Sequence, residues 1–257
     1  MYHSVTAISY HIAHPSSNTM AEAAPVPDSF ITVRSTLPRL PLPLISERPL
    51  VKTERLLIRP LAASDLEALH ELRTQPEVMF WTSAGKPDSS LDEAKAKLDY
   101  FLSPEGNNKS FNYAICFKED PSKLIGIGGC HSWGSSLGWP ELGYMFRKEV
   151  WGQGIATEFL KAWLPLWKAL PREVTEVKCD ERTLRGGNGV YENSEEMVEE
   201  RLMALTTDAN GKSQNILKKC GFEHVLTWKA REPRPTEDGT GMVLVDMPSF
   251  RYFPGRG

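Results

Sequence analysis

The stretch Val150–Leu164, VWGQGIATEFLKAWL, places Gly152 and Gly154 one residue apart, immediately before an amphipathic segment. A glycine-containing loop that leads into a helix presents bare backbone N–H groups, and the helix dipole adds partial positive charge at the same place. Small residues allow the close approach of a ligand to the backbone. The spacing therefore predicts an anion site at residues 152–157, and a tight turn without a ligand is the alternative interpretation.

Three glycine-containing runs of the sequence do not match the nucleotide-binding motifs that they resemble. The loop has Thr157 where the dinucleotide fingerprint requires its third glycine. The GIGG run of residues 126–129 lies inside a strand-like segment, not at the start of a helix. The GKS run of residues 211–213 resembles the end of a phosphate-binding P-loop, but Thr206 occupies the position of the required upstream glycine. The sequence therefore does not indicate a binding site for ATP or NAD.

Composition limits the remaining classes of function. The chain has 257 residues, of which 40% are hydrophobic and 25% charged, with a formal net charge of −3. This balance is typical of a globular protein and offers no basic surface for nucleic acid. No apolar run is long enough to span a membrane, and the N-terminus lacks a secretory signal pattern. We expect a cytoplasmic protein without a metal site, because its four cysteines lack zinc-ligand spacing: Cys116, Cys130, Cys179 and Cys220.

The chain divides into a leader and one domain. Residues 1–50 contain seven prolines and no lasting helical or strand period, so we expect an extended or partly disordered leader. Residues 51–257 are predicted to form a single domain. Within it, residues of about 171–199 combine a glycine cluster with many glutamates, and this composition predicts an acidic insertion.

Apolar periodicity predicts the elements that position the glycine loop. Strands are expected at residues 53–61, 111–119, 123–133, 141–148 and 200–208. Helices are expected at residues 64–75 and 90–103, after the glycine loop to about residue 170, and before Gly221. One or two further strands close the chain.

This order of elements, together with four motifs, resembles the GNAT superfamily of N-acetyltransferases, and within it the RimJ/RimL-like branch. The motifs are TERLLIRPL (53–61), ELGYMF (141–146), WGQGIATE (151–158) and DANGKSQNILKKCGF (208–222). The resemblance implies an α/β fold with a mixed, mostly antiparallel sheet that is splayed between its fourth and fifth strands and flanked by helices. It also implies acetyl-CoA as the co-substrate, bound in the cleft. The acceptor would be the primary amine of a protein N-terminus or of a small molecule, and the protein would be a monomer or homodimer.

The resemblance assigns residues to acetyl-CoA. The pyrophosphate would lie on the loop, with Trp151 in the first place of the family pattern. The pantetheine arm would pair with the backbone of the fourth strand and contact an asparagine before the last helix. The residues implied in cofactor binding are Met145, Phe146, Arg147, Trp151, Gly152, Gln153, Gly154, Ile155, Ala156, Thr157 and Asn210.

Two residues are candidates for proton transfer. Only a neutral amine attacks a thioester, so a base must take up a proton, and Glu141 stands where the family often has its acidic base. A structural salt bridge is the alternative role for Glu141. Many members protonate the thiolate with a tyrosine, but Leu217 occupies that position here. Ser213, which matches a serine of RimL-like enzymes, is the candidate acid. Because the tyrosine is missing, a non-catalytic acyl-CoA-binding protein remains the alternative function.

Overall fold

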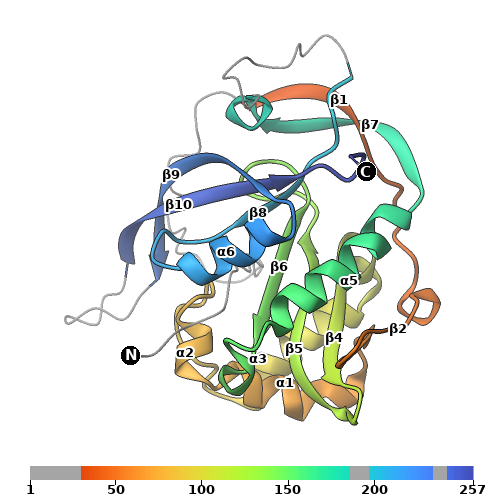
Figure 1. Ribbon diagram of the computed structural model, residues 1–257, viewed down its shortest axis with the longest axis vertical. Coiled ribbons are helices and arrows are strands. Elements are labelled where there is room, and N and C mark those ends of the chain that lie inside the picture. The colour runs from red at the N-terminus through yellow and green to blue at the C-terminus, as the bar shows by residue number, and fades with distance from the viewer. Residues whose placement is uncertain (1–29, 186–196, 234–241, 257) are drawn as a thin grey trace.

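The computed structural model describes residues 30–185, 197–233 and 242–256, and their central element is one large sheet (Figure 1). Its strand order is β2-β3-β4-β5-β6-β8-β10-β9. Among the described residues, the strands are β2 (Val51–Lys52), β3 (Leu56–Pro60), β4 (Phe111–Phe117), β5 (Asp120–Ser132), β6 (Glu141–Phe146), β8 (Leu202–Leu205), β9 (Glu223–Pro233) and β10 (Met242–Tyr252). Every neighbouring pair described is antiparallel except β6 and β8, which are parallel. The predicted mixed, mostly antiparallel sheet is confirmed.

Helices cover both faces of this sheet. They are α1 (Leu66–Arg73), α2 (Pro76–Met79), α3 (Leu91–Leu102), α4 (Pro104–Lys109), α5 (Ile155–Ala169) and α6 (Gly211–Lys219). Short 3₁₀ turns are η1 (Ile45–Glu47), η2 (Ala63–Asp65), η3 (Lys148–Val150) and η4 (Glu181–Leu184). Figure 1 shows α5 and α6 on the near face of the sheet. Helix α5 packs against the sheet through Phe159, Trp163 and Trp167, which are completely buried. Large aromatic side chains such as these bury much apolar area, and that burial stabilises the packing.

The sheet is splayed between β6 and β8, as predicted. The described register of these two strands consists of the single pair Glu141↔Met203, supported by the Met203 N–H, which donates to Pro140 O at 2.8 Å. Farther along β6, the two strands share no ladder pair among the described residues. The sheet is therefore joined at the start of β6 and divided toward its end, where the glycine loop follows.

A separate two-stranded ribbon lies at the top of Figure 1. Strand β1 (Phe30–Pro38) pairs antiparallel along its whole length with β7 (Arg172–Asp180). Val33, Leu37 and Trp139 belong to a second cluster of buried apolar side chains, distinct from the main core. The end of the leader is thus a strand of the fold, and the first part of the expected acidic insertion is its partner. Residues 186–196 of that insertion lie outside the described residues.

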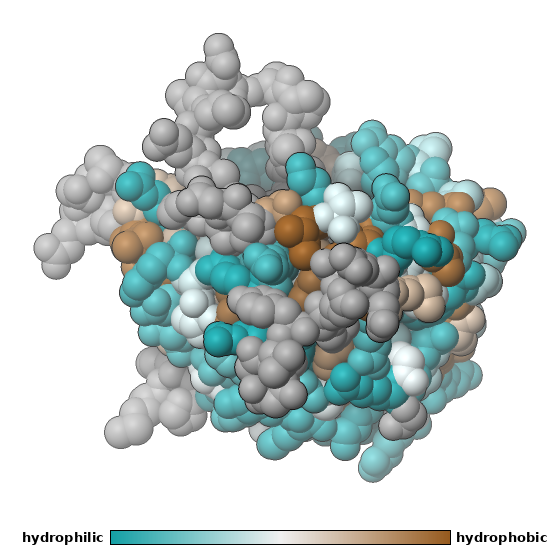
Figure 2. Space-filling model, turned by 90° about the horizontal axis from the view of Figure 1, so that it is seen from above, coloured by the Kyte–Doolittle hydropathy of each residue, from teal (hydrophilic) through white to brown (hydrophobic). Residues whose placement is uncertain are grey.

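The face of the molecule seen from the ribbon is mostly hydrophilic, with hydrophobic residues in scattered patches (Figure 2). Val174 of β7 and Leu40, two residues after β1, are exposed apolar side chains in or beside the ribbon in sequence. Among the described residues, no helix combines the length and the apolar character that crossing a membrane requires.

Candidate active site

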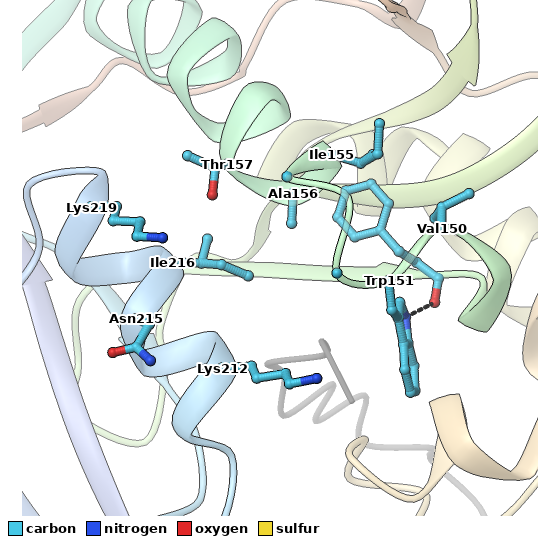
Figure 3. Close-up of a pocket in the computed structure, with 12 residues that line it drawn as sticks. Val150, Trp151, Ile155, Ala156, Thr157, Lys212, Asn215, Ile216 and Lys219 are labelled. Atoms are coloured by element: carbon cyan, nitrogen blue, oxygen red, sulfur yellow. Dashed lines mark hydrogen bonds between the residues drawn. The ribbon is translucent and has the colours of Figure 1, made fainter. Parts of the chain in front are cut away.

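The glycine loop and α6 enclose a cavity of about 220 Å³ at the N-terminus of α5 (Figure 3). One wall is the loop with the first turn of α5, and the opposite wall is α6. The cavity is lined by Phe146, Val150, Trp151, Gly152, Gly154, Ile155, Ala156, Thr157, Lys212, Asn215, Ile216 and Lys219. The structure therefore brings most of the predicted pyrophosphate loop to one cavity.

Two glycines shape the loop. Gly152 and Gly154 have φ angles of +76° and +77°, which side chains other than glycine rarely adopt. Gly154 is also the N-cap of α5, and it contributes no side-chain cap. As a result, the backbone N–H groups of residues 152–157 make no hydrogen bond to any described residue. N–H groups at a helix N-terminus can bind an anion, so this geometry is compatible with the anion site that the glycine spacing predicts.

Side chains from distant parts of the chain hold the loop in place. The indole N–H of Trp151 donates to Phe146 O at 2.8 Å and ties the loop to β6. Arg55 donates to Gln153 O at 2.9 Å and to Glu158 at 2.7 Å. The Thr53 hydroxyl donates to the same carboxylate at 2.5 Å. The motif at the start of the domain therefore acts as a clamp behind the glycine loop.

The charge of Glu158 is stabilised by this clamp. Burial raises the pKa of the Glu158 carboxyl, but hydrogen bonds from Thr53 and from the Arg55 backbone and guanidinium outweigh that effect and lower it below its ordinary value. The clamp therefore favours the ionised, carboxylate form of Glu158.

The gap between β6 and β8 exposes backbone groups of both strands. Arg147 N–H donates to Ile125 O at 2.8 Å, so it faces β5. Hydrogen-bonding directions alternate along an antiparallel strand. Met145 therefore also faces β5, whereas Tyr144 and Phe146 turn their N–H groups toward β8.

This alternation limits which backbone groups reach the gap. Arg147 donates its N–H to Ile125 O, and its C=O also accepts from the Val150 N–H at 3.1 Å. Of the three residues predicted to pair with the pantetheine arm, Phe146 turns its N–H to the gap, and the contacts of all three stay predictions. On the other side, Met203 N–H faces β6, and alternation directs the backbone of Leu205 to the gap as well.

Glu141 lies at the closed end of the gap. Its side chain is 5% exposed, and its Oε1 lies 3.5 Å from Nε2 of His131, whose side chain is 2% exposed. A register shift between Cys130 and Ser132 leaves His131 as an extra residue opposite β6. Burial raises the pKa of Glu141 well above the ordinary carboxyl value. The two groups form a buried pair, and Glu141 Oε1 accepts no hydrogen bond from the described residues.

Ser213 and Asn210 lie at the start of α6. The Asn210 side chain accepts a hydrogen bond from the Ser213 N–H at 3.2 Å and caps the helix. The hydroxyls of Ser213 and Tyr144 are 2.8 Å apart, and both side chains are fully buried. Burial raises the pKa of the Tyr144 hydroxyl, although the hydrogen bond to Ser213 opposes that effect. Tyr144 is thus the partner of the candidate acid.

Several residues at or near the cavity were not predicted from the sequence as site residues. Lys212 and Lys219 line the cavity from α6, although neither belongs to the glycine loop. Thr206 and Thr207, which follow β8, each bury a hydroxyl without a hydrogen-bond partner among the described residues. Gln153, in contrast, does not line the cavity, because its side chain bonds to Glu149 O at 2.8 Å. No cluster of three potential metal ligands occurs within the described ranges.

Comparisons with known proteins agree with this architecture. An acetyltransferase of the GNAT family from Bacillus anthracis is similar, with a TM-score of 0.53 and 17% identity over 81% of this chain and 100% of its own. A RimL ribosomal-protein α-N-acetyltransferase, solved with coenzyme A, has a TM-score of 0.56 and 14% identity over 80% of this chain and 98% of its own.

A ribosomal-protein-alanine acetyltransferase from Vibrio fischeri has a TM-score of 0.53 and 17% identity over 80% of this chain and 97% of its own. At such identities the likeness shows the fold. No curated protein matches the chain by sequence. The family model for the acetyltransferase (GNAT) domain matches residues 55–223, well over half of the chain. The chain therefore belongs to the GNAT acetyltransferase family and is an acyltransferase.

Proposed function

We propose that this protein transfers the acetyl group of acetyl-CoA to a primary amine, either a protein N-terminus or a small molecule, in a ternary complex. One observation carries the donor half of this function. Gly152, Gly154 and the first turn of α5, whose backbone N–H groups make no hydrogen bond to any described residue, border a cavity at the N-terminus of α5, which suits a diphosphate. The adjoining gap between β6 and β8 suits the pantetheine arm.

The residues of the gap fit an extended ligand that carries amides. The backbone of Tyr144 and Phe146 on one side and of Leu205 on the other would pair with it as an additional strand pairs with a sheet edge. The buried hydroxyls of Thr206 and Thr207 would gain the hydrogen-bond partners that they otherwise lack. Asn210 stands at the junction between this gap and α6.

The bound co-substrate supplies an activated acetyl thioester. Glu141, through its pair with His131, would take the proton that the amine loses as its nitrogen forms a bond with the acetyl carbon. The Phe146 N–H is placed to stabilise the negative charge that develops on the acetyl oxygen. Ser213 would give a proton to the sulfur as the carbon–sulfur bond breaks, and the Tyr144 hydroxyl, 2.8 Å away, would stabilise the Ser213 oxygen by donating a hydrogen bond. Water that enters as the products leave would return the proton to Ser213.

Thiol release from acetyl-CoA tests the proposal. We expect the full chain to release free thiol in the presence of at least one amine from a panel of N-terminal peptides, amino acids and polyamines. Glu141→Gln should abolish the amine-dependent release while acetyl-CoA still binds. Binding without release on every amine would instead support a non-catalytic acyl-CoA-binding protein, and loss of both binding and release in the unaltered chain would refute the transferase.

A further inference from the structure

Asn112 of β4 carries a buried side-chain amide whose polar atoms lack partners. The residue is 1% exposed, and neither its Oδ1 nor its Nδ2 makes a hydrogen bond within the described part of the chain. Of the described residues whose buried side chains have unpaired polar atoms, Asn112 alone has two. Its backbone, in contrast, is bonded, since Asn112 O accepts from Arg48 at 3.3 Å. Because an unpaired buried polar group costs free energy, this amide indicates a ligand or a water molecule.

The Asn112 side chain lies on the face of the sheet opposite α5. The ring of Phe111 lies 6.1 Å from that of Trp163 on α5, between centroids, so Phe111 points toward α5. Side chains alternate along a strand, and Asn112 therefore points to the other face. This is the face that α1 and α3 cover, behind the sheet in Figure 1.

Glu141, the candidate base, lies on this same face. The rings of Phe146 and of Phe159 on α5 are 6.0 Å apart between centroids, so Phe146 points toward α5. Alternation along β6 then directs Glu141 and Gly143 away from α5. The unpaired amide and the candidate base thus share one face of the sheet, and α5 with the glycine loop lies on the other.

Two glycines lie across the sheet from Asn112. The ladders place Asn112 opposite Gly129 and Gly129 opposite Gly143, so neither neighbour has a side chain that could bond to the amide. A Cβ at Gly129 would lie 2.9 Å from Asn112 Cα, which leaves no room for one. From Asn112 to Glu141 the strand spacing and rise amount to about 10 Å across the sheet and about 7 Å along β6, an interval that both side chains shorten. One extended peptide residue spans about 3.5 Å, so the first two residues of a peptide suit this interval.

We propose that Asn112 binds the backbone of the acceptor's second residue and makes the site selective for an α-amine that is followed by peptide groups. The inference rests on the proposed function, because it requires Glu141 to receive the proton of the amine. An extended residue turns its own N–H and C=O to the same side. Asn112 Oδ1 would accept from that N–H, and Nδ2 would donate to that C=O. A polyamine has no carbonyl and would leave Nδ2 unpaired.

Kinetics of the full chain with three versions of one peptide test this assignment. They are the most active N-terminal peptide of the amine panel, and the same peptide with a trans-alkene in place of its first or its second linkage. The first alkene removes the N–H of the second residue, and the second alkene removes its C=O. We expect each alkene to lower the kcat/KM of the unaltered protein about tenfold, because one group of the Asn112 amide then stays unpaired.

Asn112→Leu should raise KM for the peptide about tenfold or more with little change in kcat, and should remove most of the difference between the peptide and its alkene versions. Asn112→Ala, which only shortens the side chain, should act in the same way and serves where leucine does not fit. Tyr113→Phe is the matched control. It removes a buried, unpaired hydroxyl from the next residue of β4, which points toward α5 beside Phe111. Its KM and its alkene discrimination should equal those of the unaltered protein.

Three results would overturn the assignment. Equal use of the peptide and its alkenes by the unaltered protein would show that water alone satisfies the Asn112 amide. Full discrimination in both Asn112 variants would place the selectivity elsewhere, and acetylation of polyamines alone would exclude a peptide acceptor. Each of these leaves acetyl transfer, and hence the proposed function, intact. If no amine were acetylated, the proposed function and this assignment would be refuted together.

Discussion

The role proposed for Glu141 requires an ionised carboxylate, and burial makes that ionised form unfavourable in the folded protein. A base must be ionised to accept a proton, yet burial favours the neutral form of this carboxyl and raises its pKa. His131, 3.5 Å away, can balance the charge of the ionised carboxylate when its own imidazole is protonated. The site therefore keeps an ionisable group where an amide would be more stable.

The first prediction concerns this carboxyl. Amine-dependent kcat/KM should rise with pH through an apparent pKa above the ordinary value of about 4.3 for Glu. A pKa raised in the folded state means that stability is fully present below the unfolded pKa and is lost as pH rises through the folded pKa. Glu141→Gln should therefore raise Tm at neutral pH while removing activity. A lower Tm for the variant at neutral pH, measured by calorimetry, would contradict this account.

Backbone conformation gives a second prediction. A Cβ at Gly154 would meet only Arg55 Nη2, at 3.7 Å, so the obstacle to substitution is the φ angle of +77° rather than space. Gly154→Ala should cost about 1–2 kcal/mol of unfolding free energy and weaken acetyl-CoA binding, because the loop N–H groups change direction.

The matched control is Gly211→Ala at the start of α6, where a Cβ meets nothing within 4 Å. This substitution should stabilise the protein by about 0.4–1 kcal/mol. Urea unfolding of both variants distinguishes the two effects. Similar changes at the two positions would show that the left-handed conformation of Gly154 is not required.

The role of a residue could be predicted from the sequence where that role depends only on the residue type and its immediate neighbours. Gly152 and Gly154 indicate a left-handed backbone by being glycines, and Asn210 is a residue type that commonly caps a helix. Arg147 was not predictable, because its orientation depends on the register of β6 against β5. Lys212 and Lys219 became significant only when α6 was placed opposite the loop.

At the level of elements, the loop depends on a clamp between β3 and α5. Arg55 and Glu158 are 103 residues apart, and neither residue shows in the sequence that the other is its partner. Periodicity predicted both elements, since each is long or strongly apolar, but side-chain pairing between them requires the tertiary fold. For the same reason the pairing of β7 was not predicted, because its partner β1 lies in the proline-rich segment that precedes the expected domain.

The third prediction tests the clamp. Glu158→Gln should lower the unfolding free energy by about 1–3 kcal/mol, because three donors lose a charged acceptor, and should weaken acetyl-CoA binding. Since the pKa of Glu158 is lowered in the folded state, its contribution is present above the unfolded pKa and is lost as pH falls through the folded pKa. The difference between the variant and the unaltered protein should therefore shrink in acid.

Asp99→Asn is the control for the clamp, because Asp99 pairs with Lys95 on an exposed helix face. Its effect should stay below about 0.5 kcal/mol. Urea unfolding at several pH values measures both variants. A Glu158→Gln effect as small as that of Asp99→Asn would show that the clamp does not stabilise the loop.

At the level of the whole molecule, two buried clusters support the sheet. The main core lies between the sheet and its helices, and the second cluster lies under the ribbon, around Trp139. Trp139 precedes Glu141 by two residues, so the ribbon supports the segment that leads into the candidate base. Proline content predicted an extended segment there, but not that β1 is held by β7.

The fourth prediction tests whether β1 belongs to the fold. Leu37 is 5% exposed, and Leu37→Ala should cost about 2–5 kcal/mol by leaving a cavity in the second cluster. Leu40 is 37% exposed, so Leu40→Ala should change the unfolding free energy by less than about 0.5 kcal/mol. Thermal and urea unfolding compare them directly. Equal, small effects would show that the ribbon contributes little to stability.

The single ladder pair between β6 and β8 has a consequence for the protein before it meets its co-substrate. The backbones of β6 and β8 then face each other inside the sheet with one ladder pair between them among the described residues, as an interior edge. A ligand that pairs with both strands would join the two halves of the domain. Amide hydrogen exchange should consequently slow on β6 and β8 together, and the domain should unfold as one unit only when it is loaded.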